Sequence, residues 1–163
     1  MAKIDMSKFN KDMENVVKEF TNKDVMQQIG DYAVDRIKTR TRLGKGVKST
    51  GSEAEPLKPL KDSYREQRKR DKRSGKLSQF SSPAKSNLTR TGQMLDSISV
   101  KATAQKVLLY FRGSRKDSDA SNAEVAGFVS ESRPFFNLSK AELNGLNRFI
   151  RDLFEKIVKR NLT

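Results

Sequence analysis

The 163-residue sequence contains no cysteine, no histidine and no tryptophan. The absence of cysteine excludes disulfides and thiolate nucleophiles, and the absence of histidine removes the commonest general base. Without either residue type, the usual zinc sites cannot form. A reducing compartment fits this composition, and carboxylates, hydroxyls and lysines are the side chains left for enzymatic chemistry.

Long apolar runs are also missing. No stretch of about 18 apolar residues occurs, and "MAKIDMSKFNKDMENVV" lacks the continuous apolar core of a signal peptide. We therefore expect a soluble protein that stays in the compartment where it is made and has no membrane partner. The hydrophobic fraction is only 34% beside a charged fraction of 33%, which indicates that part of the chain is not packed core.

Positive charge is abundant, and it is concentrated in one third of the chain. The formal net charge is +14, and residues 36–90 contain 17 Lys or Arg against 5 Asp or Glu. A positive field of this kind attracts nucleic acid or an acidic protein surface. A solvated loop whose charge keeps the chain soluble is the plainer alternative, and the composition leaves both open.

Two amphipathic helices are predicted in the first quarter, because apolar residues recur at intervals of three or four. The first, Met6–Phe20, has the apolar positions Phe9, Met13, Val16, Val17 and Phe20. The second, Val25–Leu43, has Val25, Ile29, Tyr32, Ala33 and Ile37. Thr21 or Asn22 is a suitable N-cap for the second helix, and Gly44 is a suitable stop. Both apolar stripes indicate core-facing surfaces.

Residues 44–87 differ in kind from the helices before them. Gly, Ser and Pro are frequent there, large apolar residues are few and charge is dense, so the segment is expected to be a long basic loop or arm within a single domain of residues 1–163. Inside it, "LKDSYREQRKRDKR" can form one helix that starts near Asp62 or Ser63. Because that helix has almost no apolar face, it needs a partner to persist.

A short helical turn and a β-hairpin are predicted next. Thr91-Gly92 is a turn signal, and "QMLDSI" places Met94, Leu95 and Ile98 on one helical face. "SISVKAT" and "KVLLYFRG" then read as two strands joined at "TAQ". The segment "SRKDSDASNAE" follows as a polar loop, and Val125–Val129 can supply a third strand.

The last region predicts a long amphipathic helix. Ser139 to Glu142 is a capping box, and Leu143, Leu146, Ile150, Leu153 and Ile157 then follow at steps of three and four. The stripe is broad and short for a coiled coil, so we expect the helix to pack on the sheet. The predicted fold is therefore α+β, with N-terminal helices, a small antiparallel sheet of three to four strands, this C-terminal helix and an extended basic arm.

No catalytic pattern is present. Asp62, Glu66, Asp96 and Glu131 show no spacing typical of a paired acid and base or of an oxygen-ligand metal loop. "GKGVKSTG" does not match a phosphate-binding Walker loop. We therefore expect no enzyme, no catalytic residue, no metal and no cofactor.

The order of the motifs resembles the tail-completion and virion-morphogenesis proteins of tailed bacteriophages, including the Mu-type morphogenesis proteins. The resemblance covers residues 22–160. It rests on a "TG.L..SI" element, formed here by Thr91, Gly92, Met94 or Leu95, Ser97 and Ile98, followed by strands and then by an "RPF" motif, Arg133, Pro134 and Phe135, before the last helix.

The resemblance implies a structural neck protein that joins head and tail. Copies of the chain would form a ring, with a hexamer expected, between the connector or adaptor proteins and the tail tube or tail terminator proteins, in a virion assembled in the host cytoplasm. The alternative function, which the charge of the segment favours, is a basic nucleic-acid-binding protein that uses residues 36–90. Non-specific contact with genome DNA is compatible with both functions. The residues expected at the interfaces with other copies or partners are Tyr64, Arg65, Arg68, Arg70, Arg90, Thr91, Gly92, Arg133, Pro134, Phe135 and Phe136.

Overall fold

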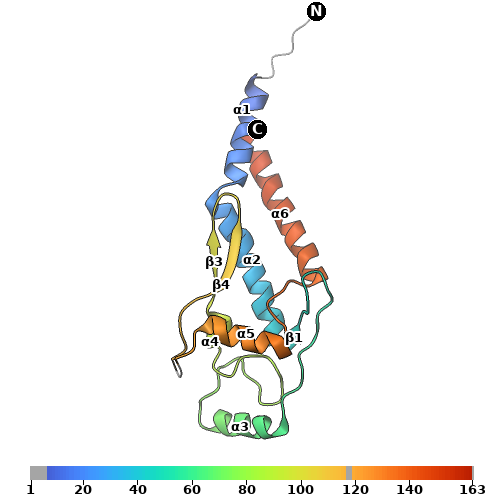
Figure 1. Ribbon diagram of the computed structural model, residues 1–163. Coiled ribbons are helices and arrows are strands. Elements are labelled where there is room, and N and C mark those ends of the chain that lie inside the picture. The colour runs from blue at the N-terminus through green and yellow to red at the C-terminus, as the bar shows by residue number, and fades with distance from the viewer. Residues whose placement is uncertain (1–6, 117–118, 163) are drawn as a thin grey trace, which may run out of the picture.

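The computed structural model describes residues 7–116 and 119–162. Its fold is α+β, with N-terminal helices, two two-stranded antiparallel sheets and a long C-terminal helix. Figure 1 shows α1 (Ser7–Phe20) and the end of α6 (Lys140–Asn161) projecting together at one end, while α3 (Asp62–Arg73) lies at the opposite end. Between them lie α2 (Lys23–Arg42) and the hairpin.

The two N-terminal helices form largely where the apolar spacing predicted them. Met6, the predicted first residue of α1, lies outside the described residues. Asn22 is the N-cap of α2, because its side-chain oxygen accepts a hydrogen bond from the backbone N–H of Asp24 at 2.8 Å. Helix α2 ends at Arg42, and Gly44 follows with a φ of 81°, the left-handed conformation that glycine adopts at helix ends.

The hairpin consists of β3 (Ile98–Ala102) and β4 (Val107–Phe111), as predicted. Its register pairs Ile98 with Phe111 and Ala102 with Val107. One face lies against α2 at Gly30, where a Cβ would come within 2.4 Å of a methyl group of Val100. Glycine at this position therefore allows the close packing of helix on hairpin.

The prediction of one sheet with three to four strands is wrong. The second sheet is a separate pair, β1 (Lys45–Gly46) with β2 (Glu55–Pro56). Residues 125–129, predicted as a third strand, belong to helix α5 (Asn122–Ser132). A capping box at Ser121 and Glu124 starts this helix. Val125, Ala126 and Val129 lie on its buried side at helical spacing, while Phe128 is exposed. Residues 117–118 of the preceding polar loop lie outside the described residues.

Helix α6 packs against α1 and α2, so the prediction that it packs on the sheet is also wrong. Two aromatic pairs join these helices: Phe154 lies 5.2 Å from Phe20, and Phe149 stacks on Tyr32 at 4.6 Å between ring centroids. Apolar residues of α1 and α2 cover the stripe, since Ile157 forms a buried cluster with Val16 and Val25. The predicted capping box of Ser139 and Glu142 is present.

Two apolar clusters form the interior. The larger cluster joins α2, the hairpin, the short helix α4 (Gln93–Asp96) and α5 around the fully buried Phe135. The smaller cluster, Val16, Val25 and Ile157, joins the three long helices. The larger cluster is the one on which the candidate site is built.

The basic segment 44–87 is folded against the rest of the chain, whereas we expected it to be extended. Val47 and Leu57 are buried, and the side chain of Arg68 is only 2% exposed. Helix α3 lies in this segment at the predicted place. The partner that holds it is a set of polar groups from residues 81–87 around Arg68, which composition does not indicate.

Candidate functional site: an arginine-lined pocket

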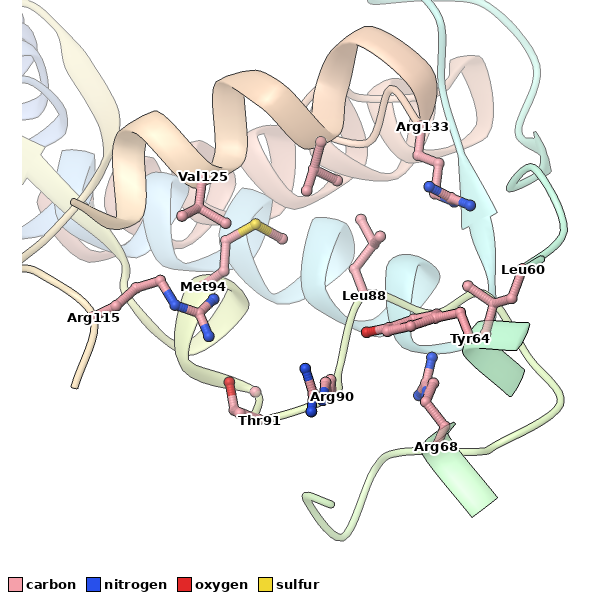
Figure 2. A pocket seen from close by; sticks show the side chains of 12 residues that line it. Leu60, Tyr64, Arg68, Leu88, Arg90, Thr91, Met94, Arg115, Val125 and Arg133 are labelled. Carbon is pink, nitrogen blue, oxygen red and sulfur yellow. The ribbon is translucent and has the colours of Figure 1, made fainter. Parts of the chain in front are cut away.

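A pocket of about 310 Å³ lies between α3, the segment before α4, and α5. Figure 2 shows its side chains, which come from parts of the chain that are far apart in sequence. They are Leu60, Tyr64, Arg68, Leu88, Arg90, Thr91, Gly92, Met94, Arg115, Val125, Val129 and Arg133. The set contains four arginines and no carboxylate.

Aliphatic side chains form one wall of the pocket. Leu88, Val125 and Val129 are half-buried and pack on the larger apolar cluster, to which Met94 belongs. Leu88 has a φ of 53°, a left-handed conformation that is rare for a residue with a branched side chain. Backbone strain of this kind is often found at functional sites. Here it accompanies the orientation of Leu88 toward the pocket in Figure 2.

Arg68 is a buried guanidinium held by neutral groups. Its Nη1 donates to the carbonyl oxygen of Lys85 at 3.2 Å, and its Nη2 donates to Ser81 Oγ and to Asn87 Oδ1. No partner for its buried Nε is found among the described residues. Burial lowers the pKa of Arg68 from its ordinary value, because removal from water disfavours the charged form.

Arg90 is a pocket arginine that is paired with a carboxylate. Its Nε and Nη2 both approach Asp71 Oδ2, at 3.0 and 2.9 Å. A guanidinium has five N–H donors, so this pair leaves donors of Arg90 for another acceptor. The side chain of Arg90 is 43% exposed, whereas that of Asp71 is 13% exposed. The pocket therefore keeps a positive balance after this pairing.

Arg133 fixes the far wall. Its Nε donates to the carbonyl oxygen of Lys58 and to Ser86 Oγ, and its Nη2 donates to the carbonyl oxygen of Pro59. One side chain at the end of α5 thus holds both the chain entering α3 and the chain leaving the basic segment. Its role in the fold is to close the pocket.

The start of α4 supplies the last part of the pocket. Gly92 has a φ of 79°, and a Cβ at this residue would lie 3.0 Å from a carboxylate oxygen of Asp96. This conformation favours glycine. Thr91 is exposed beside it, and Figure 2 shows the Tyr64 ring and the Arg115 and Arg90 side chains around the same space.

Six of the eleven predicted interface residues line this pocket: Tyr64, Arg68, Arg90, Thr91, Gly92 and Arg133. The other five lie elsewhere. Arg65 forms an ion pair with Asp62 on α3, and Arg70 is exposed on the same helix. Pro134 accepts a hydrogen bond from the N–H of Val47. Phe135 is buried in the larger cluster and Phe136 is half-buried beside it.

Sequence reasoning did not assign the remaining lining residues to the site. Val125 and Val129 were predicted to lie in a strand and were therefore not placed at the site, although the Ser-x-x-Glu signature at Ser121 indicates a helix there. Met94 was recognised as part of an apolar face. For Leu60, Leu88 and Arg115, no local pattern marks the residue, since only tertiary packing brings them to the pocket.

The chain matches no protein-family model, no curated protein and no solved structure. What defines it is therefore an α+β fold with a pocket that combines four arginines and an aliphatic wall. Within residues 7–116 and 119–162, no group of three or more carboxylates is placed to hold a metal ion. None of the helices in that range is long and apolar enough to cross a membrane.

Proposed function

We propose that this chain is a structural virion protein of a tailed bacteriophage, a tail-completion or head–tail joining subunit. Several copies, with a hexamer as the expected number, form a ring between the connector and the tail. The partners are other copies of the chain, the connector or adaptor proteins, and the tail tube or tail terminator proteins. The site of action is the neck or tail end of a virion assembled in the host cytoplasm.

One observation carries this proposal. The two short motifs that resemble the phage proteins are separated in sequence, yet Thr91 and Gly92 of the first and Arg133 of the second line the same pocket. If the two short motifs matched by chance, their residues would not be expected to lie in the same pocket. Their meeting supports the interpretation that both motifs belong to one interaction surface.

The distribution of exposed apolar residues also favours a ring subunit. Phe9 and Val17 are about half exposed on α1, Leu108 is 54% exposed on β4, and Phe128 is 73% exposed on α5. Apolar side chains on several faces suit a protein that meets neighbours on more than one side. The two-stranded hairpin adds strand edges on which another chain can pair.

A deletion of the gene tests this function. Phage lacking the chain should package DNA and yet fail to join heads and tails, giving filled heads with separate tails, or heads that leak DNA. Complementation with the intact gene should restore joined particles. Normal yields of infectious particles from the deletion strain would contradict the proposal.

Nucleic-acid binding is the second candidate, and the surface of α3 favours it. Lys69, Lys72 and Arg73 surround an open depression next to Ser82 and Pro83. Neutralising phosphates releases counterions, so binding of this kind weakens steeply with salt. A titration of short duplex DNA at increasing salt separates the candidates. The neck function predicts weak binding that vanishes at physiological salt, whereas tight binding there would favour the second candidate.

A further inference from the structure

We infer that the pocket is a docking site for a peptide segment of a partner protein in which an Asp or Glu is adjacent to a large apolar residue. The inference rests on the proposed function, because it describes how the subunit would grip a neighbour in the neck. The chemistry of the two walls defines the ligand.

The first requirement, a negative charge, follows from Arg68 and Arg133, whose guanidinium groups donate to neutral acceptors. Four arginines line the pocket, and the lining set contains no carboxylate. Asp71 forms an ion pair with Arg90, while Arg68 donates to a carbonyl, a hydroxyl and an amide oxygen. A buried charge without a carboxylate is costly, and an arriving anion lowers that cost.

A second observation also points to an anion. The Nε of Arg68 is buried and has no hydrogen-bond partner among the described residues, in a side chain that is 2% exposed. Buried donors in native proteins are nearly always satisfied, so an orphaned one at a pocket is a sign of an absent ligand or water. The carboxylate of a bound segment would complete this part of the site.

The second requirement, a large apolar side chain, follows from the opposite wall. Leu88, Met94, Val125 and Val129 line that side of the pocket, where Met94 belongs to the larger apolar cluster and the other three pack against it. Inorganic phosphate or a DNA backbone would satisfy the arginines and leave this surface in contact with water. An aliphatic or aromatic side chain beside the carboxylate removes it from water, and a volume of about 310 Å³ accommodates such a pair.

The charge of the chain favours a partner over a second copy as the source of the segment. A segment of a second copy would come from a chain with a net charge of +14, whereas an acidic segment of another protein is steered toward the pocket. The partner is therefore identified by its chemistry: an exposed acidic segment that contains a large apolar residue next to the acid.

A peptide selection tests the inference on the full-length chain. A displayed library of random heptapeptides is selected against the immobilised protein at physiological salt, and the most enriched peptide is made in solution for affinity measurements. The expected motif is an Asp or Glu next to Leu, Ile, Met or Phe. Changing that acid to its amide should weaken binding at least about tenfold, since a charged hydrogen-bonded partner is lost.

Three variants of the protein locate the binding site. Thr91→Glu places a carboxylate at the exposed edge of the pocket and should weaken the peptide about tenfold by repulsion. Thr91→Gln adds the same length without charge and should weaken it less. Ala104→Glu makes the same charge change in the exposed turn between β3 and β4, and it should leave the affinity nearly unchanged. In Figure 1 that turn lies at the end of the hairpin away from α3, α4 and α5, the elements around the pocket.

Each other outcome overturns the inference. The inference is wrong if no peptide is enriched or if the enriched motif contains no acid. It is also wrong if Thr91→Glu and Ala104→Glu change the affinity equally. Competition of the peptide by duplex DNA or inorganic phosphate at physiological salt would assign the pocket to phosphate, and enrichment of the chain's own segments would assign it to a second copy. A peptide result with normal particles from the deletion strain would instead refute the proposed function and leave the pocket assignment standing.

Discussion

Replacing Phe135 with alanine should remove a large part of the stability of this protein. Phe135 is fully buried, and its ring centroid lies 6.1 Å from that of Phe111 and 6.2 Å from that of Phe136. It also belongs to the cluster that joins α2, α4, the hairpin and α5. Truncating a buried phenylalanine costs about 3–5 kcal/mol, because transfer free energy is lost and a cavity remains.

That loss can be measured by thermal and urea denaturation of the free chain. For a chain of this length, each kcal/mol lowers the melting temperature by about 2–4 °C, so a decrease of roughly 6–20 °C is expected. Phe128→Ala is the matched control, because Phe128 is 73% exposed and its truncation should change the free energy of unfolding by no more than about 0.5 kcal/mol. A Phe135→Ala chain that melts with the parent would show that the cluster is not the core.

The neighbouring Phe136 distinguishes packing from an interface. Phe136 is half-buried and its ring lies 4.6 Å from that of Phe111, so Phe136→Ala should destabilise the free chain less than Phe135→Ala does. If Phe136 also contacts a neighbouring subunit, ring formation should fail at temperatures where the variant is folded. Normal assembly of a folded Phe136→Ala chain would remove this residue from the predicted interface.

Two further substitutions test how the basic segment is held. Arg68→Leu should lower the opening free energy of residues 62–90, measured by hydrogen exchange, by about 2–4 kcal/mol, because three acceptors lose their donor. The control variant Arg70→Leu, on the exposed side of α3, should have little effect. Equal protection of these residues in both variants would contradict the packing of α3. Gly46→Ala should lower the free energy of unfolding, measured by urea denaturation, by about 2–3 kcal/mol, because the added Cβ would lie 2.2 Å from the carbonyl oxygen of Pro134. An unchanged urea midpoint would show that residue 46 and Pro134 are farther apart than this.

The local elements were predictable because their signals are local. A few consecutive residues determine each of three such elements: the N-cap at Asn22, the capping box at Ser139 and the hairpin of β3 and β4. Helix α5 was missed because "VAGFV" satisfies both a strand and a helix pattern, and its own capping signature was not used. The position of α6 was missed because an apolar stripe shows that a surface is buried without showing which surface covers it.

The pocket could be predicted only in part. Its motif residues were identified from their order along the chain, but nothing in the sequence distinguishes Arg68 from Arg65 or Arg70 on the same basic helix. Arg68 is buried because Ser81, Lys85 and Asn87 supply acceptors, and that depends on the path of a loop with no periodicity. The expectation of an extended arm was wrong for the same reason. A composition shows how few apolar residues a segment has, but it does not show which of its polar groups form hydrogen bonds with one another.

The most direct test of the proposed neck function is a cryo-electron microscopy reconstruction of virions from the phage that, under this proposal, encodes the chain. The account predicts density for copies of this fold in a ring between the connector and the tail, with an acidic segment of a neighbouring protein in the pocket between α3 and α5. A neck reconstruction at side-chain resolution in which every ring is built from other proteins would contradict it.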